Sequence, residues 1–424
     1  MTKKEKHALI GYMGMISGFT LMMSGNTLNF WLASEKIDLE IIGIFSLISL
    51  PYGINFLMAP YMDVTEIPAM EEVFGHRLSW IVLLHTLLGT ALYLMSQINP
   101  KDNIILFAIL GFFISFTSSS LDTVLGALKT EIIDKHEQGS VSGIYILGYR
   151  IGMLLSGYGA IYLSSMLSFN RIYSLFSVFI LLSCIFFISL FRKVRNTVVE
   201  VNKTEKQTLI EGSVFTDKVG QIFKSIVPNN SAKVLFFTII FLIMYRLPDN
   251  FIGAMIIPFL IIIGYSSLDI AHSGKLFGTI SAIIGGLLSG EIMKKKNIID
   301  CLIIFGIFHS FSHLLFLIQE FYGKNIYILS LTITFEGVTG GMTMAAYIGF
   351  IASLCHGKWR ATQYSFFSSM MGLSRSTIPM FSGYIVNIYG WENFFIFICL
   401  LSFLPIFLIF YVRRLLSLKR IVSG

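Results

Sequence analysis

The chain has 424 residues, of which 55% are hydrophobic and only 13% are charged, about half of the roughly 25% usual in soluble domains. A soluble chain of this length needs a large polar surface, which this composition cannot provide. The composition therefore excludes a soluble enzyme, a nucleic-acid-binding protein and a disordered scaffold. The net charge is +7, and the distribution of the basic residues among the loops indicates how the chain is oriented in the membrane.

Long apolar runs follow one another along the chain. A transmembrane helix needs about 20 mostly apolar residues. The first run follows Lys3, Lys4 and Lys6, but it is too long for a signal peptide and no small-residue cleavage site follows, so we expect an uncleaved first span. In chain order the sequence predicts twelve membrane helices, at 8–33, 40–62, 78–97, 103–128, 140–165, 169–191, 232–262, 269–292, 299–319, 325–354, 362–388 and 391–412.

Lysine and arginine gather on one side of these predicted spans. If the N-terminus is cytoplasmic, 23 of the 31 basic residues fall in cytoplasmic segments, 4 in outside loops and 4 within spans. Because basic residues are enriched in cytoplasmic loops, this bias predicts that both termini face the cytoplasm.

A basic polar stretch at 192–231 contains the middle of the chain. It predicts two six-helix halves, 1–191 and 232–412, joined by a cytoplasmic linker and followed by a tail at 413–424. The halves share short matches: Ser-Gly-Tyr at 156–158 recurs at 382–384, and Arg150 and Arg375 both lie in the fifth span of their half. Parallel six-helix repeats define the major facilitator architecture, an all-α membrane fold.

Charged side chains interrupt the predicted spans. Each costs about 2.5–3.5 kcal/mol at the centre of a lipid-facing helix, so we expect them to face a polar pathway or one another. Structural pairing is the alternative, and Arg246 and Asp249, three residues apart on one helix, can meet as a salt bridge. The seven are Asp122, Arg150, Arg246, Asp249, Lys275, Glu336 and Arg375.

The signs of these charges indicate an anionic substrate moving with protons. Four cations against three anions leave a mildly positive cavity, and the planar fork of arginine binds carboxylates through two hydrogen bonds. Arg150, Arg375, Lys275 and Arg246 are therefore candidates for substrate binding. A buried carboxylate can take up a proton when its neighbouring charges change, and Asp122 is the first candidate for this role, with Asp249 and Glu336 as alternatives.

Other motifs are weaker. Pro51, Pro248, Pro258 and Pro379 interrupt predicted spans, and the glycine pairs 286/290 and 337/341 predict close helix packing. His309 and His313 have metal-ligand spacing, but no third ligand is near in sequence, so we expect a polar patch and no metal. We recognise no catalytic or cofactor-binding motif in the sequence. We therefore expect that the protein is not an enzyme and binds no cofactor.

Several segments resemble the AmpG-type muropeptide permeases. The most specific is Gly148-Tyr149-Arg150-Ile151-Gly152-Met153. The others include Ser118-Ser119-Ser120-Leu121-Asp122, Ser24-Gly25-Asn26-Thr27-Leu28, Leu50-Pro51-Tyr52, Phe335-Glu336 and Ala361-Thr362-Gln363-Tyr364. Together the matches extend over both halves.

The resemblance implies a proton-driven importer in the inner membrane of a bacterium, acting in peptidoglycan recycling. Its implied cargo is an anhydro-muropeptide, an anionic sugar-peptide whose carboxylates and hydroxyls fit a positive cavity. Within the matching segments, Asn26, Tyr149 and Gln363 are further candidates for substrate binding.

The sequence also departs from the family pattern. Leu121 replaces a common glutamine, Gly126 replaces a second aspartate, and Val64 follows Asp63 where an arginine is usual. These departures leave two alternatives open, a permease for another anionic solute and a membrane sensor that does not transport.

Overall fold

The computed structural model describes all residues except 1–2, 69, 133–137, 192–231, 356–359 and 423–424. Its described residues form helices and no β-strand. The helices are α1 (Lys3–Met23), α2 (Asn26–Ser34), α3 (Leu39–Ile44), η1 (Phe45–Ser49), α4 (Leu50–Val64), α5 (Met70–Phe74), α6 (His76–Ser96), α7 (Ile104–Ile132), α8 (Gln138–Ser156), α9 (Tyr158–Leu163), α10 (Phe169–Phe191), α13 (Ala232–Ile263), α14 (Ser267–Asp269), η3 (Ile270–Leu276), α15 (Phe277–Met293), α16 (Ile298–Ser312), α17 (Leu314–Tyr322), α18 (Ile326–Leu354), α19 (Arg360–Thr377), η4 (Ile378–Phe381) and α20 (Ser382–Val422). The predicted linker lies outside the described residues.

Ten segments of the described chain are long and apolar enough to cross a membrane, so the protein is a multi-pass membrane protein. Two places account for the difference from the twelve expected. The predicted span 40–62 is divided among α3, η1 and α4, and α4 begins at Leu50 with Pro51 in its first turn, where the missing backbone N–H of proline is tolerated. The last two predicted spans fall in one segment, Phe366–Arg414, which breaks at Gly390, where φ is 78°.

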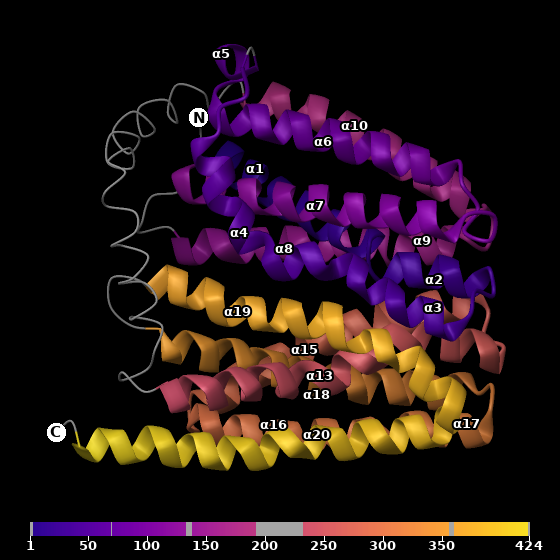
Figure 1. The fold of residues 1–424 in the computed structure, drawn as a ribbon, viewed down its shortest axis with the longest axis vertical. Helices are drawn as coiled ribbons and strands as arrows, with labels where there is room; N and C mark the ends of the chain where they lie inside the picture. Colours follow the sequence, from indigo (N-terminus) through magenta and orange to yellow (C-terminus); the bar gives the residue numbers. More distant parts are fainter. Residues whose placement is uncertain (1–2, 69, 133–137, 192–231, 356–359, 423–424) are drawn as a thin grey trace. The chain divides into compact units, whose positions relative to one another are not determined.

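The chain forms two compact units, one from residues 1–37 and 48–212 and the other from residues 38–47 and 213–424. Within each unit the long helices run side by side (Figure 1). The short helix α3 belongs to the second unit, where it packs on α20 so closely that a Cβ at Gly383 would lie 1.8 Å from the carbonyl oxygen of Leu39.

In the first unit, α1 packs most extensively on α8. A Cβ at Gly18 would lie 1.9 Å from the carbonyl oxygen of Tyr149, and one at Gly152 would lie 2.0 Å from that of Met15. Only glycine permits this approach of two backbones. The glycines of the Gly148–Met153 segment therefore lie at the contact between α8 and α1.

In the second unit, α15 packs on α18 through another set of small residues. The close packing predicted for Gly337 and Gly341 is confirmed, because a Cβ at Gly341 would lie 2.1 Å from the carbonyl oxygen of Ala282. The prediction for Gly286 and Gly290 is wrong, since among the described residues no atom of another element lies within 4 Å of a Cβ at either. Their neighbour Gly285 makes the contact instead, at 2.0 Å from the carbonyl oxygen of Val338.

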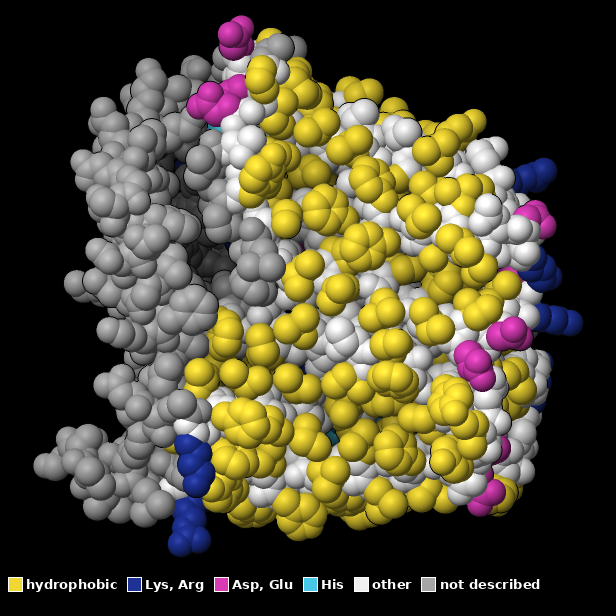
Figure 2. All heavy atoms as spheres, in the orientation of Figure 1, with side chains coloured by type: hydrophobic (Ala, Val, Ile, Leu, Met, Phe, Trp, Pro, Cys, Tyr) yellow, Lys and Arg dark blue, Asp and Glu magenta, His cyan; other side chains and the backbone are white. Residues whose placement is uncertain are grey.

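Hydrophobic side chains cover most of the face shown in Figure 2, and the charged side chains lie toward the ends of the helices. Large apolar residues such as Ile105, Leu287 and Phe321 are about 70% exposed. An apolar surface this large is unfavourable in water and suits contact with lipid.

Candidate functional site

Asp249, on α13, is the centre of an ion-pair network inside the second unit. Arg246, one turn earlier on the same helix, pairs with its Oδ2 atom, which confirms the predicted contact between these residues. His309, on α16, places its Nε2 atom 2.6 Å from Asp249 Oδ1. The Nε2 atom of His313 lies 3.9 Å from the same oxygen. One carboxylate is thus bonded on both of its oxygens.

Helix α18 and the π-helical segment η3 add further polar and charged side chains to this network. Thr339, on α18, lies with its hydroxyl oxygen 2.9 Å from His309 Nδ1. Glu336, one turn before Thr339, interacts electrostatically with His309, Asp249, Arg246 and Lys275. Lys275 lies in η3, a π-helical segment, and such segments are frequent at functional sites.

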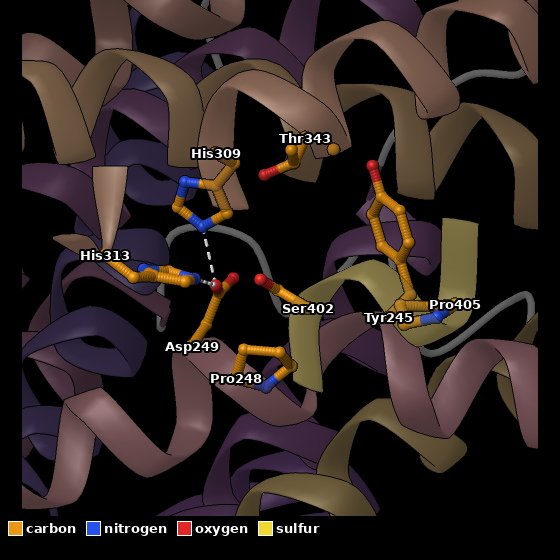
Figure 3. Close-up of a pocket in the computed structure, with 9 residues that line it drawn as sticks. Tyr245, Pro248, Asp249, His309, His313, Thr343, Ser402 and Pro405 are labelled. Carbon is orange, nitrogen blue, oxygen red and sulfur yellow. Dashed lines mark hydrogen bonds and ion pairs between the residues drawn. The ribbon is translucent and has the colours of Figure 1, made fainter. Parts of the chain in front are cut away.

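A small pocket adjoins the histidines, with Asp249 and both imidazole rings among its walls (Figure 3). It offers about 10 Å³ to the centre of a water molecule, which is close to the room that one water needs. A sugar or a peptide does not fit this space. Its other walls are Tyr245, Pro248, Gly306, Thr343, Ser402 and Pro405.

The ligand atoms of Asp249, His309 and His313 lie within 4.8 Å of one another, and a carboxylate with two imidazoles is a donor set that suits zinc. The arginine opposes this use, because Arg246 already pairs with the carboxylate and would repel a divalent cation beside it. The contacts describe an ion-pair and hydrogen-bond network.

A second polar cluster lies in the first unit around Asp122 on α7. The hydroxyl of Tyr145, on α8, donates a hydrogen bond of 3.2 Å to Asp122 Oδ1. The Tyr145 hydroxyl also lies 2.8 Å from that of Ser17 on α1. Lys129 Nζ lies 4.3 Å from the centre of the Tyr145 ring, in a cation–π contact. One turn before Asp122, Ser118 is hydrogen-bonded to Tyr52. The arrangement offers a carboxylate and several hydroxyl groups.

The structure thus groups only some of the seven predicted charges. Arg246, Asp249, Lys275 and Glu336 interact in one network. Arg150 on α8 and Arg375 on α19 are partly exposed, and neither forms an ion pair with the residues that the structure describes. Of the polar candidates, Asn26 begins α2, Tyr149 lies on α8, and Gln363 is buried on α19.

Sequence reasoning did not select His309, Thr339 or Tyr145 for the site. The spacing of His309 and His313 was the available signal, but no third ligand was expected within reach. The structure supplies Asp249 from α13, 60 residues earlier in the chain. Only the packing of separate helices reveals such a partner.

Comparison with known proteins identifies the family. Residues 10–322 match the Major Facilitator Superfamily. The AmpG 1 transporter of Rickettsia bellii is 51% identical over 395 residues, which cover 93% of this chain and 95% of the relative. The anhydromuropeptide permease of Escherichia coli is 29% identical over 421 residues, covering 99% of this chain and 82% of the permease.

Solved structures agree on the fold. A bacterial homologue of the lysosomal transporter Spinster aligns with a TM-score of 0.71 at 11% identity and covers 98% of each chain. A D-xylose–proton symporter aligns with a TM-score of 0.66 at 12% identity, over 96% of this chain and 97% of the symporter. The protein is therefore a transporter and not an enzyme, and the chain belongs to the AmpG-type permease family of the Major Facilitator Superfamily.

Proposed function

We propose that this transporter imports anhydro-muropeptides together with protons across the bacterial inner membrane, for peptidoglycan recycling. The observation that carries the proposal is the likeness to the Escherichia coli anhydromuropeptide permease over 99% of this chain. Intramembrane charges support it, because they are costly unless they serve a pathway.

We assign the cargo carboxylates to Arg150 and Arg375. Both residues are partly exposed and without an ion pair among the described residues, so each guanidinium group can bind a carboxylate by donating two hydrogen bonds. Asn26, Tyr149 and Gln363 add groups for sugar and peptide. Lys275 and Arg246 are weaker candidates, because Glu336 and Asp249 neutralise them.

We further propose twelve membrane helices with both termini in the cytoplasm. The ten recognised segments become twelve if Phe366–Arg414 crosses twice, around Gly390, and if the divided segment from α3 to α4 crosses once. Single cysteines placed in 192–231 are then expected to react with a membrane-impermeant reagent only from the cytoplasmic side. Labelling from outside would contradict this topology.

Uptake of a labelled anhydro-muropeptide tests the function. A bacterial strain without its own permease should accumulate the label when it produces this protein, and dissipating the proton gradient should abolish the accumulation. Uptake of other anions alone would instead identify a different permease. Binding without flux would identify a membrane sensor.

A further inference from the structure

The hydrogen bonds around His309 determine where its protons lie. The Thr339 hydroxyl donates to the carbonyl oxygens of Phe335 and Glu336, at 2.9 and 3.2 Å. Ser312, the other hydroxyl near Nδ1, donates to the carbonyl oxygen of His309. With each hydroxyl hydrogen on a carbonyl oxygen, the Thr339 oxygen is left to accept from His309, and on this basis we assign a hydrogen to the Nδ1 atom.

The other ring nitrogen faces a carboxylate. His309 Nε2 and Asp249 Oδ1 are 2.6 Å apart, a distance typical of a strong hydrogen bond. An ionised carboxylate can only accept, and a neutral imidazole with a hydrogen on Nδ1 has a lone pair on Nε2. Two lone pairs would repel at this distance. A proton between them resolves the conflict, and His309 is then an imidazolium with both N–H groups bonded.

The surrounding charges favour a single proton over a metal ion. Around His309 lie Asp249 and Arg246 of α13, Glu336 of α18 and His313 at the C-terminal end of α16. Lys275 of η3 interacts with Glu336. The two carboxylates balance the arginine and the lysine. A proton raises the net charge of the network by one, whereas a divalent metal raises it by two in a region of low dielectric constant.

We propose that His309 holds a transported proton, shared with Asp249, as the coupling site of the second unit. This inference rests on the proton-driven function proposed above. The adjoining pocket has room for a water molecule but not for cargo, so protons can reach the ring separately from the substrate. Loss of the proton removes the charge–charge attraction between the imidazolium and Asp249, so α16 and α13 can separate there.

The local structure of α13 allows this movement. Pro248 lies inside the helix immediately before Asp249. It has no N–H to bond the preceding turn, so the helix can bend beside the carboxylate. Protonation at His309 thereby controls a contact between two helices, which a transporter requires in order to couple proton movement to a conformational change.

The test is transport by the full-length protein in proteoliposomes, with His309→Gln as the main variant. Glutamine has a similar reach but does not ionise. We expect loss of gradient-driven accumulation while exchange of cargo across the bilayer continues. His85→Gln is the matched control, because His85 is a fully buried histidine on α6 in the other unit, and it should accumulate cargo as the wild type does.

A spectroscopic measurement does not depend on transport. Nitrogen NMR of protein with ¹⁵N-labelled histidine should show an imidazolium signal that His309→Gln removes and His85→Gln retains. If His309→Gln does not fold, Thr339→Val serves instead. It removes the acceptor of the Nδ1 hydrogen, so the imidazolium is less stable and accumulation should shift to lower pH.

The outcomes separate the two proposals. Accumulation by the wild type that does not depend on the proton gradient would refute the proposed coupling itself. If accumulation by the wild type depends on the proton gradient and His309→Gln accumulates cargo normally, only the assignment to His309 is refuted. A neutral His309 at the pH of transport, or stoichiometric zinc binding that His309→Gln abolishes, would also overturn this assignment.

Discussion

Two adjacent glycines on α15 provide a sharp test of the packing in the second unit. A Cβ at Gly285 would lie 2.0 Å from the carbonyl oxygen of Val338, and ordinary contact begins at 3.4 Å. Gly285→Ala therefore forces α15 and α18 apart by at least about 1.4 Å. Overpacking of this kind costs about 1–3 kcal/mol, and the backbone atom involved cannot rotate away. The Cβ of Gly286→Ala meets no atom of another element within 4 Å in the described part of the chain.

The comparison cancels the intrinsic effect of the substitution. Replacing glycine by alanine favours a helix by about 1 kcal/mol at either position, so only the difference in contacts remains. Thermal unfolding of the purified proteins, followed by size-exclusion chromatography, should give a lower midpoint for Gly285→Ala and an unchanged or higher one for Gly286→Ala. Equal midpoints would refute the packing of α15 on α18 described above.

Two further predictions concern the first unit. Arg150→Lys keeps the charge but loses the planar fork, so we expect cargo affinity measured by equilibrium binding to fall by about 1–3 kcal/mol with normal expression; poor folding with unchanged affinity would indicate a structural role. Asp122→Asn cannot ionise, and we expect it to abolish accumulation in uptake assays while exchange partly survives. Accumulation equal to wild type would leave coupling to the second unit alone.

The membrane fold was largely predictable because it depends on composition and periodicity. Apolar runs of the required length located the membrane segments, and Arg246 and Asp249 could be paired because they are one helical turn apart. The division of α3 from α4 was harder to foresee. Pro51 marked the break, but the packing of α3 on Gly383 of the second unit depends on residues more than 300 positions away.

The site was only partly predictable, because it is formed by contacts between helices that are far apart in the sequence. An ionisable residue in an apolar run is visible in the sequence, whereas its partner on another helix is not. His309 therefore looked like part of a polar patch until Asp249 was placed beside it. Likewise, the sequence gives no reason to distinguish Gly285 from its neighbour Gly286. The two differ only because Gly285 lies on the face of α15 that packs against α18.

The pairing of Arg246 with Asp249 leads to a prediction about stability and function together. Their side chains are only 16% and 12% exposed, so removing one charge leaves the other poorly solvated. Arg246→Gln and Asp249→Asn should each destabilise the protein by about 3–5 kcal/mol.

The double variant distinguishes a stabilising pair from two independent residues. With both charges removed, and with His309 able to give up its proton once Asp249 is gone, neither residue leaves an unpaired ion, so thermal unfolding should show a smaller loss than either single variant. A loss equal to the sum of the two would show that the residues act independently and would contradict the ion pair. Accumulation of cargo should nevertheless stay abolished in the double variant, because asparagine cannot provide the carboxylate that shares the proton of His309. Recovered stability without recovered accumulation would thus separate the structural role of Asp249 from its role in coupling.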